Sequence, residues 1–309
     1  MMTKTDLTTR RQFLKASALA AVALPPLVGA QQSPPAPARK RRIKKGLMWG
    51  SVPGSMTVME KFKLIKNAGF EGVEVDSGMN HDEVLQGRDA TGLIIASVVD
   101  SVHWSDTLAD PKPEVREKGL KGLTTSLHDC KAYGATSVLL VPAVVSQQVS
   151  YDQAYTRSME EIKKVTGLAE QLGVKIAIEN VWNHFLLSPL EAARYVDEFH
   201  SPALAWHFDV GNVISIGWPE QWIHIVGSRI HKLHIKEYSR KKQNEEGQWK
   251  GFEVEYLEGD NNWPAVMRAL DDIGYQGWGT AEPAYWPSGV DVPTRLAQVS
   301  RKLDEIFSL

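Results

Sequence analysis

Residues 204–212 (LAWHFDVGN) and 230–238 (IHKLHIKEY) are two short apolar runs that become polar at their carboxyl ends. Asp209 stands near the end of the first run, and His234 and Lys236 stand near the end of the second. In a parallel α/β barrel the body of each strand packs in the core, and its carboxyl end opens onto the active face. The two runs are therefore interpreted as barrel strands that present functional side chains on one face.

Two further runs end in the same way. Residues 175–180 (KIAIEN) carry Glu179 near their end, and residues 277–283 (GWGTAEP) carry Glu282. Because side chains alternate between the two faces of a strand, each polar group is expected on the barrel-interior side. The groups expected to converge are Glu179, Asp209, His234 and Glu282.

Three carboxylates and one imidazole at one point predict a site for a single divalent metal ion. Such an oxygen-rich set suits Mn²⁺, the preferred expectation, as well as Mg²⁺ or Co²⁺, and it tolerates Zn²⁺. A cation also neutralises carboxylates that are costly to bury inside a barrel. The alternative is that each carboxylate caps a helix or pairs with Lys or Arg. Capping or ion pairing would explain any one of these groups alone. Four groups that all face the barrel interior near the ends of their strands favour a metal site.

A metal held by this set would leave positions for two substrate oxygens, such as the carbonyl and hydroxyl of a ketose. Polarising the carbonyl acidifies the adjacent C–H bond, and carboxylates can then remove and return the proton. Glu179 and Glu282, which lie on two different strands, are the candidate catalytic acid/base pair.

The whole chain from residue 46 alternates strand and helix patterns. Strands are expected at 46–51, 72–76, 93–100, 137–142, 175–180, 204–210, 230–237 and 277–282. Helices are expected at 56–68, 81–90, 114–133, 151–172, 189–199, 219–226, 263–273 and 293–307. Eight such repeats predict a single-domain (β/α)8 TIM barrel. The first strand lacks the following Gly-x-Gly-x-x-Gly of a dinucleotide-binding fold.

The N-terminal region has the composition of an export signal. Residues 8–15 (TTRRQFLK) precede a short apolar stretch and a small-residue cleavage site, which resembles a twin-arginine-type signal peptide over residues 1–30. Residues 31–45 form a Pro-rich, basic segment that is expected to be a linker, so the barrel is expected over 46–309. The protein is therefore expected to be periplasmic or otherwise exported; an uncleaved N-terminal anchor is the alternative.

The composition and net charge of the chain limit the kinds of molecule that it is expected to bind. The chain has 309 residues, 43% hydrophobic and 23% charged, with a net charge of −2. A mildly acidic protein gains no general attraction to phosphate backbones, which argues against nucleic acid as a partner. Cys130 is the only cysteine, so no intrachain disulfide can form.

The most specific motifs resemble those of one known family. IAIEN, HFDVGN, HKLHIKEY and EGDNNWPAVMRALDDIGYQGWGTAEP are similar to segments of the xylose isomerase-like TIM barrels, the sugar phosphate isomerase/epimerase superfamily. Ketose 3-epimerases and hydroxypyruvate isomerase belong to it, and the resemblance runs from about residue 45 to the C-terminus. It implies the same four metal ligands, with Glu179 and Glu282 doubling as acid and base.

The resemblance also implies substrate contacts. Arg240 matches an arginine that ketose 3-epimerases place near the substrate, and His103 is similar to a substrate-side residue of related members. Tryptophans at the strand ends could stack on a sugar ring, and Lys236 could bind a substrate oxygen or offset the carboxylates. The expected substrate-binding residues are His103, Trp104, Trp182, Asn212, Lys236 and Arg240.

Two departures from the epimerase pattern affect the expected reaction. Asn212 replaces a substrate-contacting histidine, and Phe185 replaces a glutamate. The first hypothesis is an exported, metal-dependent isomerase or epimerase of an unphosphorylated ketose or keto-sugar, acting through an enediolate. The second is a 3-keto-glycoside lyase or hydratase that uses the same site, which the two departures suit. The third is a non-catalytic sugar-binding barrel.

The segment 239–261 is a long polar insertion between the last two expected strands. Family members are often oligomers, so a homo-oligomer is compatible with the resemblance. The insertion is therefore interpreted as either an interface element or a lid over the site.

Overall fold

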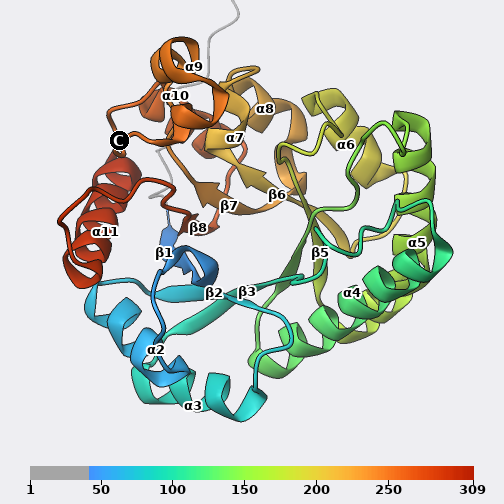
Figure 1. Ribbon diagram of the computed structural model, residues 1–309, viewed down its shortest axis with the longest axis horizontal. Helices are drawn as coiled ribbons and strands as arrows, with labels where there is room; N and C mark the ends of the chain where they lie inside the picture. Colours follow the sequence, from blue (N-terminus) through green and yellow to red (C-terminus); the bar gives the residue numbers. More distant parts are fainter. Residues whose placement is uncertain (1–41) are drawn as a thin grey trace, which may run out of the picture. The chain divides into compact units, whose positions relative to one another are not determined.

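The computed structural model describes residues 42–309, which form a closed ring of eight parallel strands (Figure 1). The strands are β1 (Ile43–Met48), β2 (Gly72–Asp76), β3 (Ile94–Val99), β4 (Ser137–Leu140), β5 (Lys175–Glu179), β6 (Leu204–Asp209), β7 (Ile230–Ile235) and β8 (Gly277–Ala281). Each pairs with its neighbours in sequence order, and β1 pairs with β8 to close the ring. The predicted (β/α)8 TIM barrel is confirmed.

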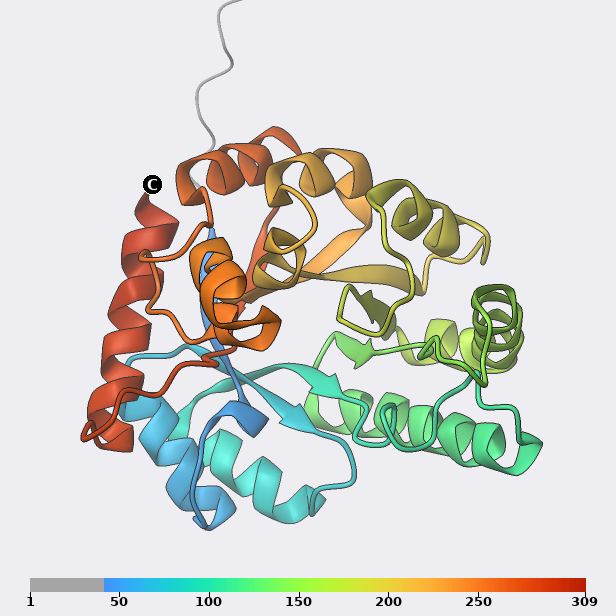
Figure 2. The ribbon, with the colours of Figure 1, turned by 45° about the horizontal axis from the view of Figure 1, so that its top comes forward.

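Helices surround the strands in the order of the chain (Figure 1). The main helices are α2 (Val58–Asn67), α3 (His81–Thr91), α4 (Pro113–Tyr133), α5 (Tyr151–Leu172), α6 (Pro189–Asp197), α8 (Pro219–Val226), α10 (Trp263–Asp272) and α11 (Val292–Ser308). Figures 1 and 2 show α11 beside α2, so the last helix meets the first. No helix within residues 42–309 combines the length and apolarity needed to cross a membrane.

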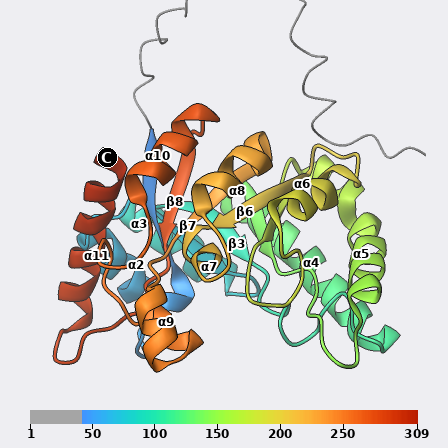
Figure 3. The same cartoon turned by 90° about the horizontal axis from the view of Figure 1, so that it is seen from above.

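Short helices occur where none was expected, and the first of them replaces the end of the predicted strand 46–51. They are η1 (Trp49–Ser51), α7 (Val210–Ile214), η2 (Gly227–Arg229), α9 (Arg240–Glu246) and η3 (Gln248–Phe252). Asp209 caps α7 by accepting a hydrogen bond from Asn212 N at 2.9 Å, so the chain turns into a helix directly after β6. The segment 239–261 contains α9 and η3, and Figures 2 and 3 show α9 at one end of the barrel.

The first strand begins three residues earlier than predicted. Ile43 pairs with Gly277 of β8, so residues 43–45 belong to the barrel rather than to the predicted linker. The charged side chains there are used at the strand's starting edge: Lys44 lies over the ring of Trp278, and Lys45 donates to Ser300 Oγ at 3.0 Å. Because residues 44 and 45 are lysines that continue the basic segment, the sequence pattern did not indicate that the strand begins here. The predicted signal peptide and the rest of the linker lie outside the described residues.

Local signals set the helix boundaries. Gly134 and Gly173 end α4 and α5 with φ of 75° and 68°, the left-handed conformation that glycine adopts without strain. Ser188 caps α6 by accepting a hydrogen bond from Glu191 N at 3.2 Å. These signals explain why the boundaries of most helices could be predicted within two residues.

Two helical glycines should respond oppositely to substitution by alanine. A Cβ at Gly119 of α4 would lie 2.1 Å from Asp106 O, whereas nothing lies within 4 Å of one at Gly167 of α5. We expect Gly119→Ala to reduce the free energy of unfolding by about 3 kcal/mol. Gly167→Ala should increase it by about 0.5–1 kcal/mol. Urea unfolding of both variants tests this, and equal stabilities would contradict the close packing at Gly119.

Candidate metal centre and reaction cavity

Four predicted side chains meet at the carboxyl ends of the strands. Ligand atoms of Glu179, Asp209, His234 and Glu282 all lie within 4.8 Å of one another. The Nδ1 atom of His234 is 3.1 Å from Glu179 Oε1 and 3.1 Å from Glu282 Oε2. We refer to these four residues as the quartet.

The strand register explains why the quartet converges. Glu179 and Asp209 are the last residues of β5 and β6, and Glu282 follows the last residue of β8. Asp209 is the direct partner of His234 in the pairing of β6 with β7. Because all strands are parallel, their carboxyl ends lie at the same end of the ring and bring these groups together.

Lys236 lies beside the quartet and offsets part of its negative charge. Its ammonium nitrogen is 3.0 Å from Asp209 Oδ2 and 2.8 Å from Glu282 Oε2. Burial opposes ionisation of Glu282, but Lys236 and His234 outweigh burial and lower its pKa to about 2. Burial dominates at Glu179 and raises its pKa to about 7. The two candidate acid/base groups therefore have opposite electrostatic environments.

The quartet fits a divalent cation. It offers three carboxylates and one imidazole, a donor set suited to a hard or borderline ion. Asp209 Oδ2 is buried without a hydrogen-bond partner, although Lys236 is close enough for an ion pair. The two buried carboxylates and the partly exposed Glu282 exceed the charge that one lysine and one histidine supply. A cation would satisfy the free oxygen and balance that excess.

Glu74 of β2 is a site residue that the sequence interpretation missed. Its Oε1 atom is 2.7 Å from His234 Nε2, and Ser97 Oγ donates a hydrogen bond to its other oxygen. The pair holds the imidazole with Nδ1 facing the quartet, as carboxylates commonly do for metal-binding histidines. A signal was present: Glu74 stands between two valines of the strand GVEVD, in phase with Asp76, so alternation places its carboxylate at an inward position.

A second cluster lies one layer below the quartet. Glu74, His207 and His234 also have ligand atoms within 4.8 Å of one another. Both ring nitrogens of His207 are buried without a hydrogen-bond partner, and burial lowers its pKa, so this imidazole is neutral. His207 is thus a packed interior histidine, and the carboxylate-rich quartet remains the better cation site.

A cavity of about 430 Å³ opens beside the quartet. Its lining residues come mainly from connections that follow the strands: Trp104, Val181, Trp182, Asn212, Lys236, Trp249, Phe252, Glu253, Glu282 and Ala284. Four of the six predicted substrate-binding residues are among them, namely Trp104, Trp182, Asn212 and Lys236. Aromatic walls around a few polar groups are typical of a small-molecule site.

The other two predicted substrate-binding residues do not line this cavity. His103 is buried, and its Nδ1 accepts a hydrogen bond from Val141 N at 3.3 Å. Arg240 donates to the carbonyl oxygens of Ile214 and Gly217, at 2.8 and 2.6 Å. The guanidinium of Arg240 therefore joins α9 to the connection between α7 and α8, and it is committed to backbone groups rather than to the cavity.

The insertion 239–261 contributes Trp249 and Phe252 to the cavity wall. This agrees with its interpretation as a segment over the site, although the sequence analysis named neither residue. Both rings pack on Trp182, with centroid distances of 4.8 and 4.7 Å. Phe185, the residue that departs from the epimerase pattern, packs instead against Tyr151 and is buried. It belongs to the hydrophobic core and cannot supply acid/base chemistry.

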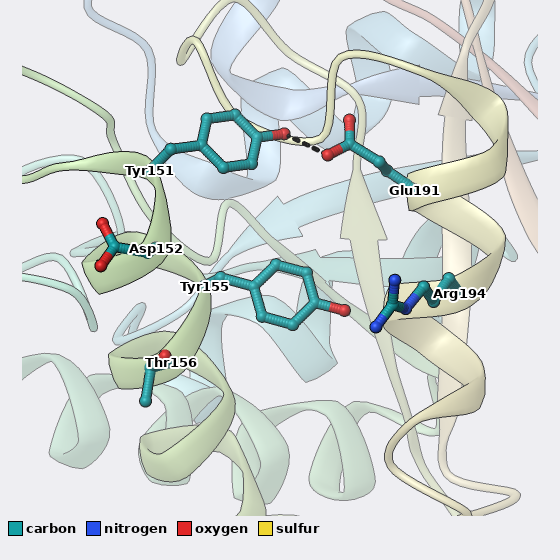
Figure 4. A pocket seen from close by; sticks show the side chains of 6 residues that line it. All are labelled: Tyr151, Asp152, Tyr155, Thr156, Glu191 and Arg194. Carbon is teal, nitrogen blue, oxygen red and sulfur yellow. Dashed lines mark hydrogen bonds between the residues drawn. The ribbon is translucent and has the colours of Figure 1, made fainter.

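A larger hollow, about 530 Å³, lies away from the quartet between α5 and α6 (Figure 4). Several of its polar groups are already paired: Tyr151 donates to Glu191 Oε1 at 2.9 Å, and Arg194 donates to Glu198, which lies outside the lining, at 2.6 Å. It has no convergent unpaired groups or metal-binding cluster among the described residues. The cavity beside the quartet is therefore the better candidate site despite its smaller volume.

The burial of His103 should make stability depend on pH. Burial lowers its pKa to about 4, whereas an unfolded histidine titrates near 6.5. Below pH 6.5 the unfolded chain takes up a proton that the folded chain refuses, so stability falls with decreasing pH. Between pH 7 and 4 we expect wild type to lose about 3 kcal/mol more than His103→Asn. Urea titrations at several pH values measure the difference, and parallel losses would contradict the assignment.

Comparison with known proteins gives the family. The model of the xylose isomerase-like TIM barrel matches residues 62–303. L-Ribulose-5-phosphate 3-epimerase UlaE from Salmonella paratyphi A is 22% identical over 251 residues, covering 77% of this chain and 86% of that protein. This relative is a sugar epimerase by name.

Two solved structures share the fold. The apo 3-keto-D-glucoside 4-epimerase YcjR from E. coli has a TM-score of 0.70 at 19% identity, covering 87% of this chain and all (100%) of that chain. D-Psicose 3-epimerase, solved in the presence of D-fructose, has a TM-score of 0.71 at 18% identity, with 85% and 98% covered. Since the family model spans most of the chain and the barrel is closed, this protein belongs to the xylose isomerase-like TIM barrel family.

Proposed function

We propose that this protein is a metal-dependent sugar epimerase or isomerase that acts on an unphosphorylated ketose or keto-sugar. The observation that carries the proposal is the meeting of two carboxylates, Glu179 and Glu282, with Asp209 and His234 beside an aromatic-walled cavity. The epimerase relatives support the reaction class.

The residues of the quartet have distinct roles in this reaction. A divalent cation, for which we propose Mn²⁺, would polarise the carbonyl of the substrate. The carboxylate of Glu179 removes the proton from the adjacent carbon, and the bonding electrons pass to the carbonyl oxygen to give an enediolate. Glu282 returns a proton to the opposite face of the carbon. Because Lys236 and His234 keep its carboxylate ionised, Glu282 first takes up that proton from solvent, while Glu179 releases its own proton to solvent. The reverse reaction exchanges the two roles. Lys236, 2.8 Å from Glu282, places positive charge beside the reacting oxygens.

The cavity favours a substrate without phosphate. Lys236 is the only Lys or Arg among the described residues that line it. Its ammonium is already paired with Asp209 and Glu282. Phosphate groups are normally bound by unpaired cations or helix N-termini, so a neutral sugar fits this lining better.

Export is part of the proposal and rests on the sequence alone. Arg10 and Arg11 precede the apolar stretch of the predicted signal. Phosphorylated sugars are scarce outside the cytoplasm. An exported enzyme would therefore meet unphosphorylated sugars. Cell fractionation of the full-length protein, with Arg10→Lys/Arg11→Lys as the control, tests the location.

Proton exchange in D₂O tests the proposed reaction. The Mn²⁺-loaded protein is incubated with free ketoses and 3-keto-glycosides, and proton NMR follows the carbon-bound signals. We expect metal-dependent loss of one proton signal, and the product formed separates epimerisation from elimination. If no sugar exchanges and no metal binds, the enzyme proposal is wrong and the sugar-binding alternative replaces it.

A further inference from the structure

Two exposed tryptophans stand at the mouth of the cavity. Trp249 is 70% exposed and Trp104 is 51% exposed, yet both line the cavity that reaches Lys236 and Glu282. Exposed apolar surface in a concave site marks contact with a ligand more often than chance exposure does. The mouth therefore has aromatic surface that the quartet chemistry does not use.

Trp249 is presented by a short helix that is held firmly. Tyr238 donates its hydroxyl to Gln248 O at 2.8 Å, and Ser239 N donates to Gly251 O at 2.8 Å. A Cβ at Gly251 would lie 2.3 Å from Tyr238 Cζ, so η3 lies directly on the tyrosine ring. Trp249 also packs against Trp182, so its exposed face is displayed in a defined position.

Trp104 approaches the cavity from another part of the barrel. Its ring packs edge-on against His103, with centroids 5.7 Å apart, and His103 is itself buried and hydrogen-bonded to Val141 N. Trp104 follows β3 and Trp249 follows β7, and these strands are opposite each other in a closed ring of eight. The two rings therefore reach the mouth from opposite sides.

The charges at the mouth are already neutralised. Glu253 lines the cavity, but Lys250 Nζ lies 2.6 Å from its Oε1 atom. Lys236, the one cationic side chain in the described lining, is also paired, so no unpaired cation there can bind an anionic group. Two aromatic faces without free charge match the apolar faces of a neutral sugar ring.

We propose that the mouth is a subsite for a second sugar ring, so that the natural substrate is a glycoside rather than a free monosaccharide. The inference rests on the proposed function, because it assigns the reacting keto-sugar unit to the quartet. Trp104 and Trp249 line the same cavity as Glu282 but remain largely exposed, so their faces are free to contact a ring attached to the reacting one. A neutral ring attached to it lies between the two tryptophans.

Kinetics with one-ring and two-ring probes test the subsite. The probes are methyl 3-keto-glucoside and the 3-keto derivative of cellobiose, and the readout is proton exchange in D₂O. In wild type we expect the KM of the two-ring probe to be lower by roughly tenfold. Trp249→Ala and Trp104→Ala should each raise that KM by about fivefold to tenfold and raise the one-ring KM by a clearly smaller factor.

Trp218→Ala is the matched control. Trp218 is 53% exposed and packs on Arg240, but it does not line the cavity, so both KM values should stay as in wild type. Trp249→Tyr keeps an aromatic face and should restore most of the two-ring affinity. Equal KM values for the two probes, or the same increase for both probes in Trp249→Ala, would overturn the subsite.

Binding of unreactive sugars separates this inference from the proposed function. Cellobiose and methyl glucoside have no keto group beside a C–H bond, so saturation-transfer NMR reports their binding alone. Cellobiose binding that depends on Trp249, without exchange of any keto probe, would support the subsite and reject the proposed reaction. Exchange of both keto probes without a two-ring preference would support the reaction and reject the subsite.

Discussion

Glu179→Gln should reduce metal-dependent proton exchange by on the order of 10³-fold or more. Gln keeps the shape of the side chain and one oxygen, but its amide cannot accept a proton from carbon at neutral pH. Glu179 is also a member of the quartet, and its carboxylate lies 3.1 Å from His234 Nδ1. Because the variant removes one charged oxygen donor from the proposed metal site, its affinity for Mn²⁺ should fall as well. Single-turnover exchange in D₂O at saturating Mn²⁺ separates loss of the base from loss of the metal.

The control for this prediction is another buried glutamate. Glu161 of α5 is 6% exposed and pairs with Arg116 and Lys164 outside the barrel interior. Glu161→Gln should lower stability but leave the exchange rate per folded molecule unchanged. If Glu179→Gln retained wild-type exchange with Mn²⁺ bound, Glu179 could not be the base.

Glu74→Gln should weaken Mn²⁺ binding by about 10–100-fold. The variant keeps a group that can accept a hydrogen bond from His234 Nε2, but it removes the negative charge 2.7 Å from that nitrogen. A neutral partner makes the imidazole a weaker ligand and fixes its orientation less strongly. Isothermal titration with Mn²⁺ measures the affinity, and the EPR spectrum of bound Mn²⁺ reports the ligand geometry.

Asp129→Asn provides a matched control for Glu74→Gln. Asp129 of α4 holds His81, the first residue of α3, in a similar carboxylate–histidine pair, 2.7 Å apart. Neither residue belongs to the quartet, so this variant should bind Mn²⁺ as wild type does. Ser97→Ala, which removes only one hydrogen bond to Glu74, should have a smaller effect than Glu74→Gln. Unchanged affinity in Glu74→Gln would show that Glu74 is only a packing residue.

The sequence by itself determined the barrel and the members of the quartet. Both follow from short-range periodicity: a strand alternates its side chains every second residue, so Glu179 and Asp209 could be assigned to the inner face from their own segments. Parallel strands then bring their carboxyl ends together in any closed ring. The resemblance to the family added the same four residues, and the structure places them within 4.8 Å.

Only the tertiary structure decided what surrounds the quartet. Glu74 lies 160 residues before His234, and their contact at 2.7 Å depends on how the strands stagger around the closed ring. Arg240 and Trp249 belong to one insertion, yet one holds a neighbouring connection and the other lines the cavity. Local periodicity carries no information about such contacts, because they are set by the packing of separate elements. For that reason the members of the quartet could be predicted from the sequence, whereas Glu74 and the residues at the mouth of the cavity could not.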